Sequence, residues 1–393
     1  MVITNFLPLH AQKAIATLEK SGFEAYAVGG CVRDFLLCRE FFDIDIATSA
    51  TPSEILSVFS EYKTIETGLK HGTVTVLIDS HPIEITSFRI DGEYSDNRHP
   101  EKVSFTKNLL SDLERRDFTV NAIAYNEKTS FFDPFEGRKD IKKRIIRCVG
   151  DPEKRFSQDA LRILRALRFS SCLSFEIEGK TAEAICEKKD LLNNIASERI
   201  NKEFSLLICG ENAHKVLDAF SPVFDIFAKG INTSQKISSL PPYIIPRLCG
   251  ILYFLPLENS ETILKNLKYD KKTISSVLSI LSQVKTPLST DLEIKKCLAF
   301  LKEENFRTLI ELKSLFGTEN FNKPFVLKAL DHIISQKQCL YISDLKVDGN
   351  DLISLGYPKG KIIGETLNLV LNQVLEGNIP NNRQEIMDFL HQK

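Results

Sequence analysis

Several patterns are missing from this sequence, and each absence excludes a class of protein. The formal net charge is −1, so the molecule as a whole has no positive field, and any surface for nucleic acid must be a local patch. The nine cysteines contain no CxxC pair and are odd in number, which argues against a disulfide framework or a zinc site and favours a reducing cytoplasm. The seven histidines contain no HExxH motif.

Targeting and membrane segments are missing as well. The first twenty residues have no signal-peptide pattern, and the most apolar region, residues 240–257, is interrupted by prolines and Arg247. A membrane span needs roughly 20 unbroken apolar residues. We therefore expect a cytoplasmic protein with no membrane segment, and no sequence feature points to an obligate protein partner.

The composition that is present is typical of a soluble globular protein, and 393 residues predict more than one domain. Residues 22–140 mix strand-like alternation, including a hairpin at 72–88 with a turn at 79–82, with helical stretches. From about residue 141 the spacing of apolar residues is helical to the end, with helices expected at 141–148 and 157–169. The sequence therefore predicts an α+β N-terminal part followed by an all-α remainder. The polar residues 89–105 between them are predicted to be a mobile loop.

The stretch DIDIA places two carboxylates on one face of a predicted strand. Asp43 and Asp45 point to the same side, roughly 6–7 Å apart, while Ile44 points to the core. A third acid, Glu84, lies in another predicted strand between residues expected to be buried, where a charge is costly unless it is paired or metal-bound. Three carboxylates on a shared face can hold hard divalent cations such as Mg²⁺.

A double glycine precedes these acids at a predicted strand-to-helix turn. Gly29 and Gly30 allow the backbone to approach a phosphate closely, and the helix that follows offers free N–H groups. Arg33, in the first turn of that helix, carries a planar guanidinium suited to holding a phosphate. Taken alone, a tight turn and an exposed acidic strand would explain these features. Together with three acids they indicate nucleotidyl transfer assisted by two metal ions.

These motifs resemble a known family. The sequence resembles the bacterial class II tRNA nucleotidyltransferases, which are the CCA-adding enzymes of the DNA polymerase β superfamily. The motifs that carry the resemblance are GGCVRDFLL with DID, RRDFTVNA (115–122), DPFEGRKDI (133–141), QDALRILRALRF (158–169) and ERINKEFSLL (198–207). The match covers roughly residues 20–210, and residues 344–371 resemble the family more weakly. It implies a seahorse-like shape with a head at 1–140, a neck at 141–210, a body at 211–275 and a tail at 276–393.

The resemblance also implies substrates, cofactors and site residues. CTP and ATP would be the substrates, two Mg²⁺ ions the cofactors, and the acceptor stem and 3′ end of tRNA the partner. The metal ligands and catalytic carboxylates would be Asp43, Asp45 and Glu84. The nucleotide would be bound by Gly29, Gly30, Arg33, Arg116, Asp117, Asn121, Asp159, Arg162, Arg165 and Arg168.

Four of these residues recur every three positions in one predicted helix. Asp159, Arg162, Arg165 and Arg168 lie close in pairs, but the stripe rotates around the helix, so all four cannot meet one small group. We assign Asp159 and Arg162 to the base and the other two to phosphates. An exposed charged helix face is the alternative explanation.

The chemistry of the bases supports this assignment. Cytosine and adenine both present an amino donor beside a ring-nitrogen acceptor, which match the carboxylate of Asp159 and the guanidinium of Arg162. Uracil and guanine present a carbonyl beside an N–H, and their carbonyl would meet the carboxylate acceptor to acceptor. One acid–arginine pair can therefore admit C and A and reject U and G without a nucleic-acid template.

Gln158 departs from the family, which usually has glutamate before this aspartate. Glutamate would pair electrostatically with Arg162 one turn later, whereas glutamine accepts only a neutral hydrogen bond. The departure bears on the tightness of base selection and leaves the reaction class unchanged.

Two regions are candidates for tRNA contact. The basic cluster at residues 137–147 would meet the acceptor-stem backbone, or else forms a solvated charged face. Gly356, Gly360, Lys361 and Gly364 resemble a glycine-bearing hairpin that would lie against a phosphate backbone, with ordinary helix capping as the alternative.

The sequence therefore predicts a tRNA nucleotidyltransferase that adds CCA. An A-adding enzyme or a bacterial poly(A) polymerase has nearly the same motifs and stays open, while the full-length stretch 89–105 argues against a CC-only enzyme. A small-molecule nucleotidyltransferase would not need the long helical C-terminal half. The three intact carboxylates argue against an inactive RNA-binding relative.

Overall fold

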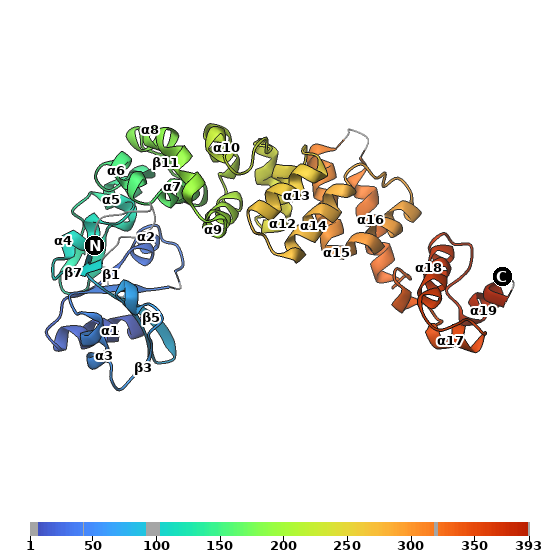
Figure 1. Cartoon of the computed structure of the whole chain (residues 1–393), viewed down its shortest axis with the longest axis horizontal. Helices are drawn as coiled ribbons and strands as arrows, with labels where there is room; N and C mark the ends of the chain where they lie inside the picture. The colour runs from blue at the N-terminus through green and yellow to red at the C-terminus, as the bar shows by residue number, and fades with distance from the viewer. Residues whose placement is uncertain (1–6, 42, 92–102, 318–320, 392–393) are drawn as a thin grey trace. The chain divides into compact units, whose positions relative to one another are not determined.

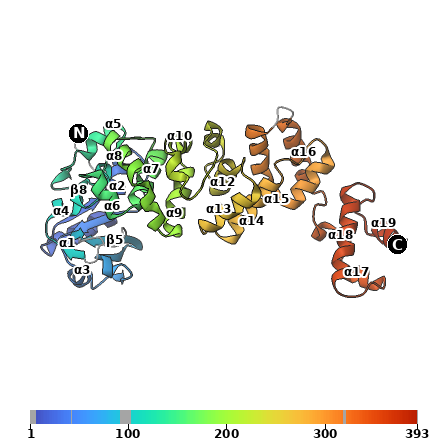
Figure 2. The same ribbon diagram turned by 45° about the horizontal axis from the view of Figure 1, so that its top comes forward.

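The computed structural model describes residues 7–41, 43–91, 103–317 and 321–391. The chain forms two compact units, Met1–Lys229 and Gly230–Lys393 (Figure 1; Figure 2). In the described residues the first unit combines β-sheet with helices, and the second consists of helices and loops. This confirms the predicted α+β part and all-α remainder. The finer division into four parts stays a prediction.

A mixed sheet of seven strands, counted over the described residues, forms the centre of the first unit. The pair β2 and β5 is parallel and the other neighbouring pairs are antiparallel. The strands in spatial order are β3 (Lys63–Ile65), β4 (Thr73–Ile78), β5 (His81–Ser87), β2 (Asp45–Thr48), β1 (Ala25–Val28), β8 (Ala124–Asn126) and β9 (Ser130–Phe132).

The predicted hairpin at residues 72–88 is confirmed, with a turn of two residues instead of the four expected. The strands β4 and β5 pair antiparallel up to Ile78↔His81, so Asp79 and Ser80 alone form the turn. Both turn residues have positive φ, 51° and 67°, as two-residue turns between right-twisted strands require. The short turn fixes the register of β5, the strand that carries one of the predicted catalytic acids.

The prediction that residues 89–105 form a loop is wrong at both ends. In the structure β6 (Arg89–Asp91) and β7 (Val103–Phe105) pair antiparallel. Both segments contain β-branched or aromatic residues that favour strands, and the polar residues around them obscured this signal. The residues between the two strands lie outside the described ranges.

Helices surround the sheet and continue beyond it along the chain. In the described part of this unit they are α1 (Leu9–Lys20), α2 (Gly30–Leu36), α3 (Pro52–Val58), α4 (Leu109–Glu114), α5 (Gly137–Lys143), α6 (Pro152–Gln158), α7 (Leu161–Leu173), α8 (Gly179–Lys188), α9 (Ser197–Ile208), α10 (Ala213–Ala219) and α11 (Ser221–Phe224). Short 3₁₀ turns are η1 (Leu69–His71), η2 (Thr119–Asn121) and η3 (Lys189–Asn194).

Residues 141–148 do not form the single helix that was predicted. They finish α5 and then enter β10 (Ile145–Ile146), which pairs in parallel with β11 (Glu176–Ile177). Arg144 lies between helix and strand in the left-handed conformation, with φ 56°. The two consecutive isoleucines, both β-branched, favour the strand once the helix has ended.

The predicted helix at 157–169 is two helices in the structure. Helix α6 ends at Gln158, Asp159 has extended backbone angles of φ −139° and ψ 100°, and α7 begins at Leu161. The Oδ1 atom of Asp159 accepts from the Leu161 N–H at 3.2 Å, a local bond through which aspartate competes with helix formation. Asp159 and Arg162 are therefore not spaced along one continuous helix.

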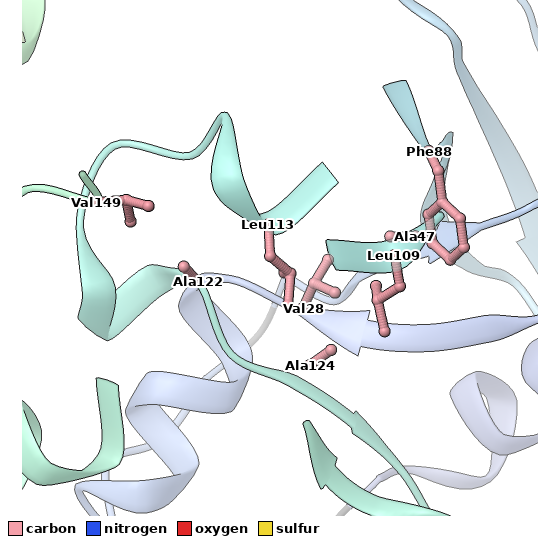
Figure 3. Packing of buried hydrophobic residues seen from close by; sticks show 8 residues of the cluster. All are labelled: Val28, Ala47, Phe88, Leu109, Leu113, Ala122, Ala124 and Val149. Atoms are coloured by element: carbon pink, nitrogen blue, oxygen red, sulfur yellow. The ribbon is translucent and has the colours of Figure 1, made fainter. Parts of the chain in front are cut away.

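A buried cluster packs α4 against the strands next to it (Figure 3). Leu109 and Leu113 on α4 share this cluster with Val28 at the end of β1 and Ala47 on β2. Phe88, Ala122, Ala124 and Val149 complete it. The packing places α4 and the residues that follow it beside the strand ends that lead to Gly29.

The second unit is built from helices in its described part. They are α12 (Ile244–Leu252), α13 (Leu257–Asn266), α14 (Lys271–Ser282), α15 (Asp291–Phe316), α16 (Lys323–Ser335), α17 (Gly349–Ser354), α18 (Lys361–Leu375) and α19 (Arg383–His391), with 3₁₀ turns η4 (Gln235–Ser239) and η5 (Ile342–Asp344). A separate apolar cluster that includes Leu352, Val370 and Ile386 holds α17, α18 and α19 together. Across the described ranges, none of the helices has both the length and the apolarity that crossing a membrane requires.

Candidate active site

The three predicted catalytic acids lie on, or just before, the neighbouring inner strands β2 and β5, and we call them the carboxylate cluster (Asp43, Asp45 and Glu84). Asp45 and Glu84 face each other in register on the parallel strands β2 and β5. Asp43 lies two residues before β2. The side chains of Asp43 and Asp45 are exposed, whereas that of Ile44 between them is buried. The predicted alternation is therefore confirmed. Glu84 lies between the buried Ile83 and Ile85, as predicted, but its own side chain is exposed, so its charge does not carry the cost of full burial.

The charge of the carboxylate cluster is only partly compensated by the protein. Loss of hydration raises the pKa of Asp45, and repulsion from Glu84 and Asp43 adds to this, while Arg116 opposes it. Mutual repulsion among carboxylates is the condition that a hard cation relieves, and their oxygens are the donors that such cations prefer. Among the residues that the structure describes, no three His, Cys, Asp or Glu side chains converge to hold a metal ion. The carboxylates thus fit the chemistry of a divalent cation without forming a closed cage.

The glycine turn lies directly beside this cluster. Gly29, between β1 and α2, has φ 77°, a conformation that strains any residue with a side chain. A Cβ atom built on Gly29 would lie 3.3 Å from Nη1 of Arg116 and 3.8 Å from Oδ2 of Asp45. A Cβ atom on Gly30 would lie 3.7 Å from Nη2 of Arg33. The glycines therefore leave room between the arginines and the first carboxylate.

Arg116 is anchored at one end and keeps donor capacity at the other. Its Nη2 donates to Oδ2 of Asp112 on α4 at 3.1 Å. Its Nε is buried and has no hydrogen-bond partner among the described residues. A buried donor without a partner is uncommon in folded proteins and is explained when a ligand supplies the acceptor. This guanidinium, next to Gly29 and Asp45, is placed to meet an anionic ligand.

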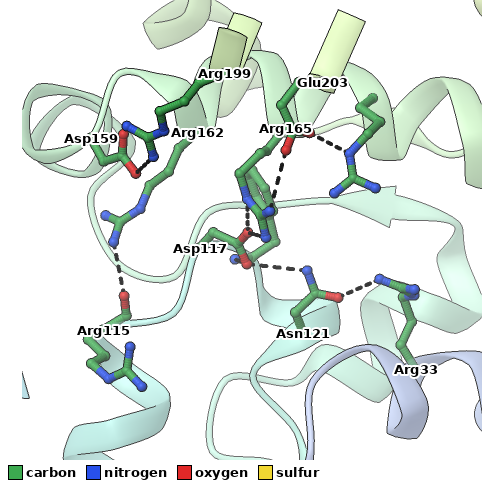
Figure 4. A network of polar contacts seen from close by, with 11 residues as sticks. Arg33, Arg115, Asp117, Asn121, Asp159, Arg162, Arg165, Arg199 and Glu203 are labelled. Carbon is green, nitrogen blue, oxygen red and sulfur yellow. Dashed lines mark hydrogen bonds and ion pairs between the residues drawn. The ribbon is translucent and has the colours of Figure 1, made fainter. Parts of the chain in front are cut away.

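Five more of the predicted nucleotide residues form, together with Glu203, a network that we call the arginine–carboxylate network: Arg33, Asp117, Asn121, Arg165 and Arg168 (Figure 4). Arg33 donates to Oδ1 of Asn121 at 2.8 Å and forms an ion pair with Asp34. Asn121 in turn donates to Oδ1 of Asp117 at 3.2 Å. The phosphate role of Arg33 stays a prediction, and in the structure its guanidinium is already bound to two side chains.

The same network continues onto α9. Arg165 donates twice to Oδ2 of Asp117, from Nε at 2.8 Å and from Nη2 at 2.5 Å, and it lies 3.7 Å from Glu203. Arg168 donates to Glu203 at 2.5 Å. Phosphate binding by Arg165 and Arg168 stays a prediction as well. Their present partners fix both guanidiniums between α7 and the segments that it packs against.

The network makes stability depend on pH in a stated direction. Burial alone would raise the pKa of Asp117, but the charge and hydrogen bonds of Arg165, with the Asn121 amide, outweigh it and hold the pKa at about 2 instead of 3.8. The ionised carboxyl therefore stabilises the fold above about pH 4, and this stabilisation is lost as the pH falls toward 2. Its size is about 2 kcal/mol.

We expect Asp117→Asn to unfold more easily than the parent protein at pH 5, with the difference shrinking by about 2 kcal/mol between pH 5 and pH 2.5. Denaturant unfolding of the full chain at several pH values measures it. Arg165→Gln should remove the same pH dependence, because Arg165 is the charge that lowers the pKa of Asp117. If the difference in unfolding free energy between Asp117→Asn and the parent does not change with pH, Asp117 is not the group that titrates in this range.

Asp159 and Arg162, which we call the base-reading pair, have different partners. Oδ2 of Asp159 lies 3.5 Å from Nη2 of Arg199 on α9. The buried Arg162 donates to the backbone carbonyl of Arg115 at 3.1 Å, to that of Arg155 at 3.3 Å, and to Oε1 of Gln158 at 3.3 Å. A base that pairs with Arg162 must share or replace one of these acceptors.

Several site residues were not found from the sequence. Arg199 and Glu203 lie four residues apart on α9; Arg199 pairs with Asp159, and Glu203 pairs with Arg165 and Arg168 of α7. The available signal was their opposite charge at i,i+4 inside the ERINKEFSLL motif, which places both on one helix face. The buried Asp112 was missed as well, although it precedes Arg115 and Arg116 of the RRDFTVNA motif by three and four residues, the spacing of ion pairs on a helix.

Three consecutive residues connect all parts of the site. Arg116 lies beside the carboxylate cluster, Asp117 belongs to the arginine–carboxylate network, and the carbonyl of Arg115 accepts from Arg162 of the base-reading pair. Direct contacts thus link this segment to Asn121, Arg162 and Arg165. The segment therefore lies between the glycine turn with Asp45 on one side and Arg162 on the other.

Three family models match the chain. They are the Poly A polymerase head domain at residues 25–147, the probable RNA and SrmB-binding site of polymerase A at residues 174–220, and tRNA nucleotidyltransferase domain 2 at residues 249–390.

Curated relatives match over nearly the whole chain. It is 36% identical to the CCA-adding enzyme of Lactobacillus delbrueckii subsp. bulgaricus, over 97% of this chain and 96% of that protein. It is also 36% identical to the CCA-adding enzyme of Streptococcus mutans, over 98% of each chain. The solved structure of the Bacillus stearothermophilus CCA-adding enzyme in complex with CTP aligns with a TM-score of 0.81 at 30% identity, covering 99% of this chain and 98% of that one.

Proposed function

The chain belongs to the family of bacterial CCA-adding enzymes, which are tRNA nucleotidyltransferases, and we propose that its carboxylate cluster, Arg116 and base-reading pair form one site for CTP and ATP. The observation that carries this proposal is the pairing of Asp45 with Glu84 in register on parallel strands, beside the Gly29 turn. The relative that aligns with a TM-score of 0.81 was solved with CTP.

The carboxylate cluster would hold two Mg²⁺ ions. When bound, such ions activate an attacking hydroxyl and neutralise a departing pyrophosphate. Asp45, raised in pKa by lost hydration and by its acidic neighbours, is the acid whose charge a cation stabilises most directly. Asp43 and Glu84 would supply the remaining protein oxygens from either side of it.

The triphosphate would lie along the glycine turn. Gly29 and Gly30 keep the space beside Asp45 free of side chains, and Arg116 offers a guanidinium whose Nε has no partner in the described part of the chain. Arg33, held by Asn121, would add a second positive charge at the same turn. The reacting phosphate would then be oriented from two sides. The rigid elements β1 and α2 would lie on one side of it, and the anchored side chain of Arg116 on the other.

The base would lie between Asp159 and Arg162. The carboxylate accepts from the amino group of cytosine or adenine, and the guanidinium donates to the ring nitrogen. Arg199 and Gln158 hold these two side chains from behind. No nucleic-acid template is needed for this choice, because the pattern that C and A share differs from that of U and G.

The tRNA would meet basic and glycine-bearing surfaces. On α5 and just after it, the exposed Arg138, Lys142, Lys143 and Arg144 form a positive face suited to an acceptor-stem backbone. In the second unit, a Cβ atom added at Gly356, Gly360 or Gly364 would meet nothing within 4 Å, so a phosphate backbone could approach there. Because all nine cysteines are free, we propose that this reaction takes place in the cytoplasm.

One assay tests the proposal. Purified full-length protein is given Mg²⁺, each nucleoside triphosphate separately, and tRNA transcripts ending before C74, after C75 and after A76. We expect CTP to extend the first and ATP the second, and neither to extend the third. Incorporation of A alone would assign an A-adding enzyme, and long A tails would assign a poly(A) polymerase. Failure to extend any transcript would reject the proposal.

Gln158→Glu is expected to sharpen base selection. The Oε1 atom of Gln158 accepts from Arg155 at 3.2 Å as well as from Arg162, so a carboxylate there would bind both arginines with a charge-assisted bond. Discrimination of CTP against UTP should improve by about twofold, with little change in maximal rate for CTP. Steady-state kinetics with CTP, ATP and UTP measure this.

Ser157→Glu is the matched control, because it adds the same charge at the exposed neighbouring position, where the side chain contacts neither arginine. It should leave the CTP to UTP ratio unchanged. A large fall in CTP turnover in Gln158→Glu would instead mean that the glutamine itself contacts the base or the tRNA.

A further inference from the structure

Asp112 is a fully buried carboxylate that serves no step of the proposed reaction directly. It lies on α4 between Leu109 and Leu113, both members of the buried cluster, and its exposed fraction is 0%. Oδ1 accepts from Nε and Nη2 of Arg115, at 3.0 and 2.7 Å, and Oδ2 accepts from Arg116 at 3.1 Å. One carboxylate therefore holds two consecutive arginines.

The two arginines lead to opposite ends of the nucleotide site. Arg116 reaches the glycine turn and Asp45, where the triphosphate would lie. Arg115 offers its backbone carbonyl to Arg162, whose guanidinium reads the base. Figure 4 shows this contact, with the carbonyl of Arg115 and the guanidinium of Arg162 pointing toward one another.

Asp112 also fixes the start of a strand. Its Oδ1 atom accepts from the backbone N–H of Arg89 at 3.3 Å, and Arg89 is the first residue of β6. Burial alone would raise the pKa of Asp112, but Arg116 and Arg115 outweigh it and lower the pKa, so the group stays ionised at neutral pH. An ionised acceptor orients its donors more strongly than a neutral one does.

We propose that Asp112 is a positioning residue for the nucleotide, which acts through Arg116 at the triphosphate and through the backbone of Arg115 at the base. This inference rests on the proposed function. It gives a role in substrate binding to a side chain that touches no substrate.

Electrostatics and positioning predict opposite results for Asp112→Asn. Removing a negative charge near an anionic ligand would by itself strengthen the binding of CTP and ATP. If the carboxylate instead orients Arg116, its loss weakens binding, because the amide cannot accept from both arginines with charge assistance. We expect the dissociation constants of both nucleotides to rise about tenfold.

The matched control is Asp140→Asn. Asp140 is also a buried carboxylate of the first unit, 4% exposed, and it accepts from the hydroxyl of Thr119 at 2.7 Å and from Arg147 at 3.1 Å. Its replacement likewise removes a buried negative charge and an ion pair, here with the more exposed Arg147, without touching Arg115 or Arg116. Equilibrium dialysis of CTP and ATP against the full chain, without tRNA, is combined with thermal unfolding of each variant.

A double substitution tests whether Asp112 acts through Arg116. Arg116→Gln should weaken triphosphate binding, and adding Asp112→Asn to it should cause much less than the tenfold loss seen in the parent, since coupled residues are not additive. If Asp112→Asn does not fold, Arg115→Gln takes its place, because it removes two of the donors that hold the carboxylate. Arg115→Gln should raise both dissociation constants about threefold.

The outcomes separate this inference from the proposed function. Wild-type affinity in Asp112→Asn, tighter binding, an equal loss in Asp140→Asn, or full additivity with Arg116→Gln would each overturn the positioning role. In all of these cases the parent enzyme would still extend tRNA. A parent protein that extends no transcript rejects the proposed function instead, whatever the binding data show.

Discussion

Asp45→Asn is expected to abolish transfer of both C and A to tRNA while making the protein slightly more stable. Loss of a carboxylate from a shared cation site removes several kcal/mol of transition-state stabilisation, so transfer should fall about a thousandfold or more. The stability gain follows from the raised pKa of Asp45, because its ionised form is disfavoured in the folded protein. Nucleotide incorporation and thermal unfolding at pH 7 measure the two effects, and binding of tRNA should survive.

The matched control for Asp45→Asn is Asp79→Asn. Asp79 is an exposed acid of the same sheet, in the hairpin turn between β4 and β5, and asparagine accepts its positive φ. This variant should transfer nucleotides at the parent rate. Normal turnover by Asp45→Asn would reject the metal-binding role of the carboxylate cluster.

Asp159→Ala is expected to relax the choice of base. The carboxylate is the acceptor that meets the amino group of C or A and opposes the carbonyl of U or G, and such a contact is worth about 1–3 kcal/mol. Incorporation of UTP relative to CTP should therefore rise about ten- to a hundredfold. Competition kinetics with both nucleotides on a tRNA transcript measure the ratio.

Two further variants test whether the Asp159 carboxylate causes the change in base choice. Asp190→Ala removes an exposed acid on η3, away from the base-reading pair, and should leave the ratio unchanged. Arg199→Met removes the partner of Asp159 and should give an intermediate ratio, because the carboxylate stays but is no longer held. An unchanged ratio in Asp159→Ala, with activity retained, would place base recognition elsewhere.

The features predicted correctly from the sequence have local causes. The common side of Asp43 and Asp45 follows from the two-residue repeat of an extended chain, and the bend at Gly29 follows from glycine between strand and helix. Each needs knowledge of only a few neighbouring residues. The order of the motifs along the chain then indicated the protein family.

The features that were missed depend on residues far apart in the chain. Nothing near Asp159 is a glycine or proline, yet the helix breaks there, and its carboxylate meets Arg199 forty residues later. Arg165 and Arg168, assigned to phosphates from the sequence, both form ion pairs with Glu203 of α9, which the sequence did not predict. Ion pairs between separate helices leave no periodic trace in either helix alone.

The adjacency of Arg115, Arg116 and Asp117 sets the geometry of recognition by covalent bonds. Consecutive Cα atoms are about 3.8 Å apart, whatever the salt concentration or pH. Salt weakens the outer ion pairs, such as that of Arg165 with Asp117, which is one-third exposed on the arginine side. Raising the ionic strength should therefore broaden the range of orientations of each side chain. The separation between the backbone positions of Arg115 and Arg116, which anchor the base side and the phosphate side of the site, should stay constant.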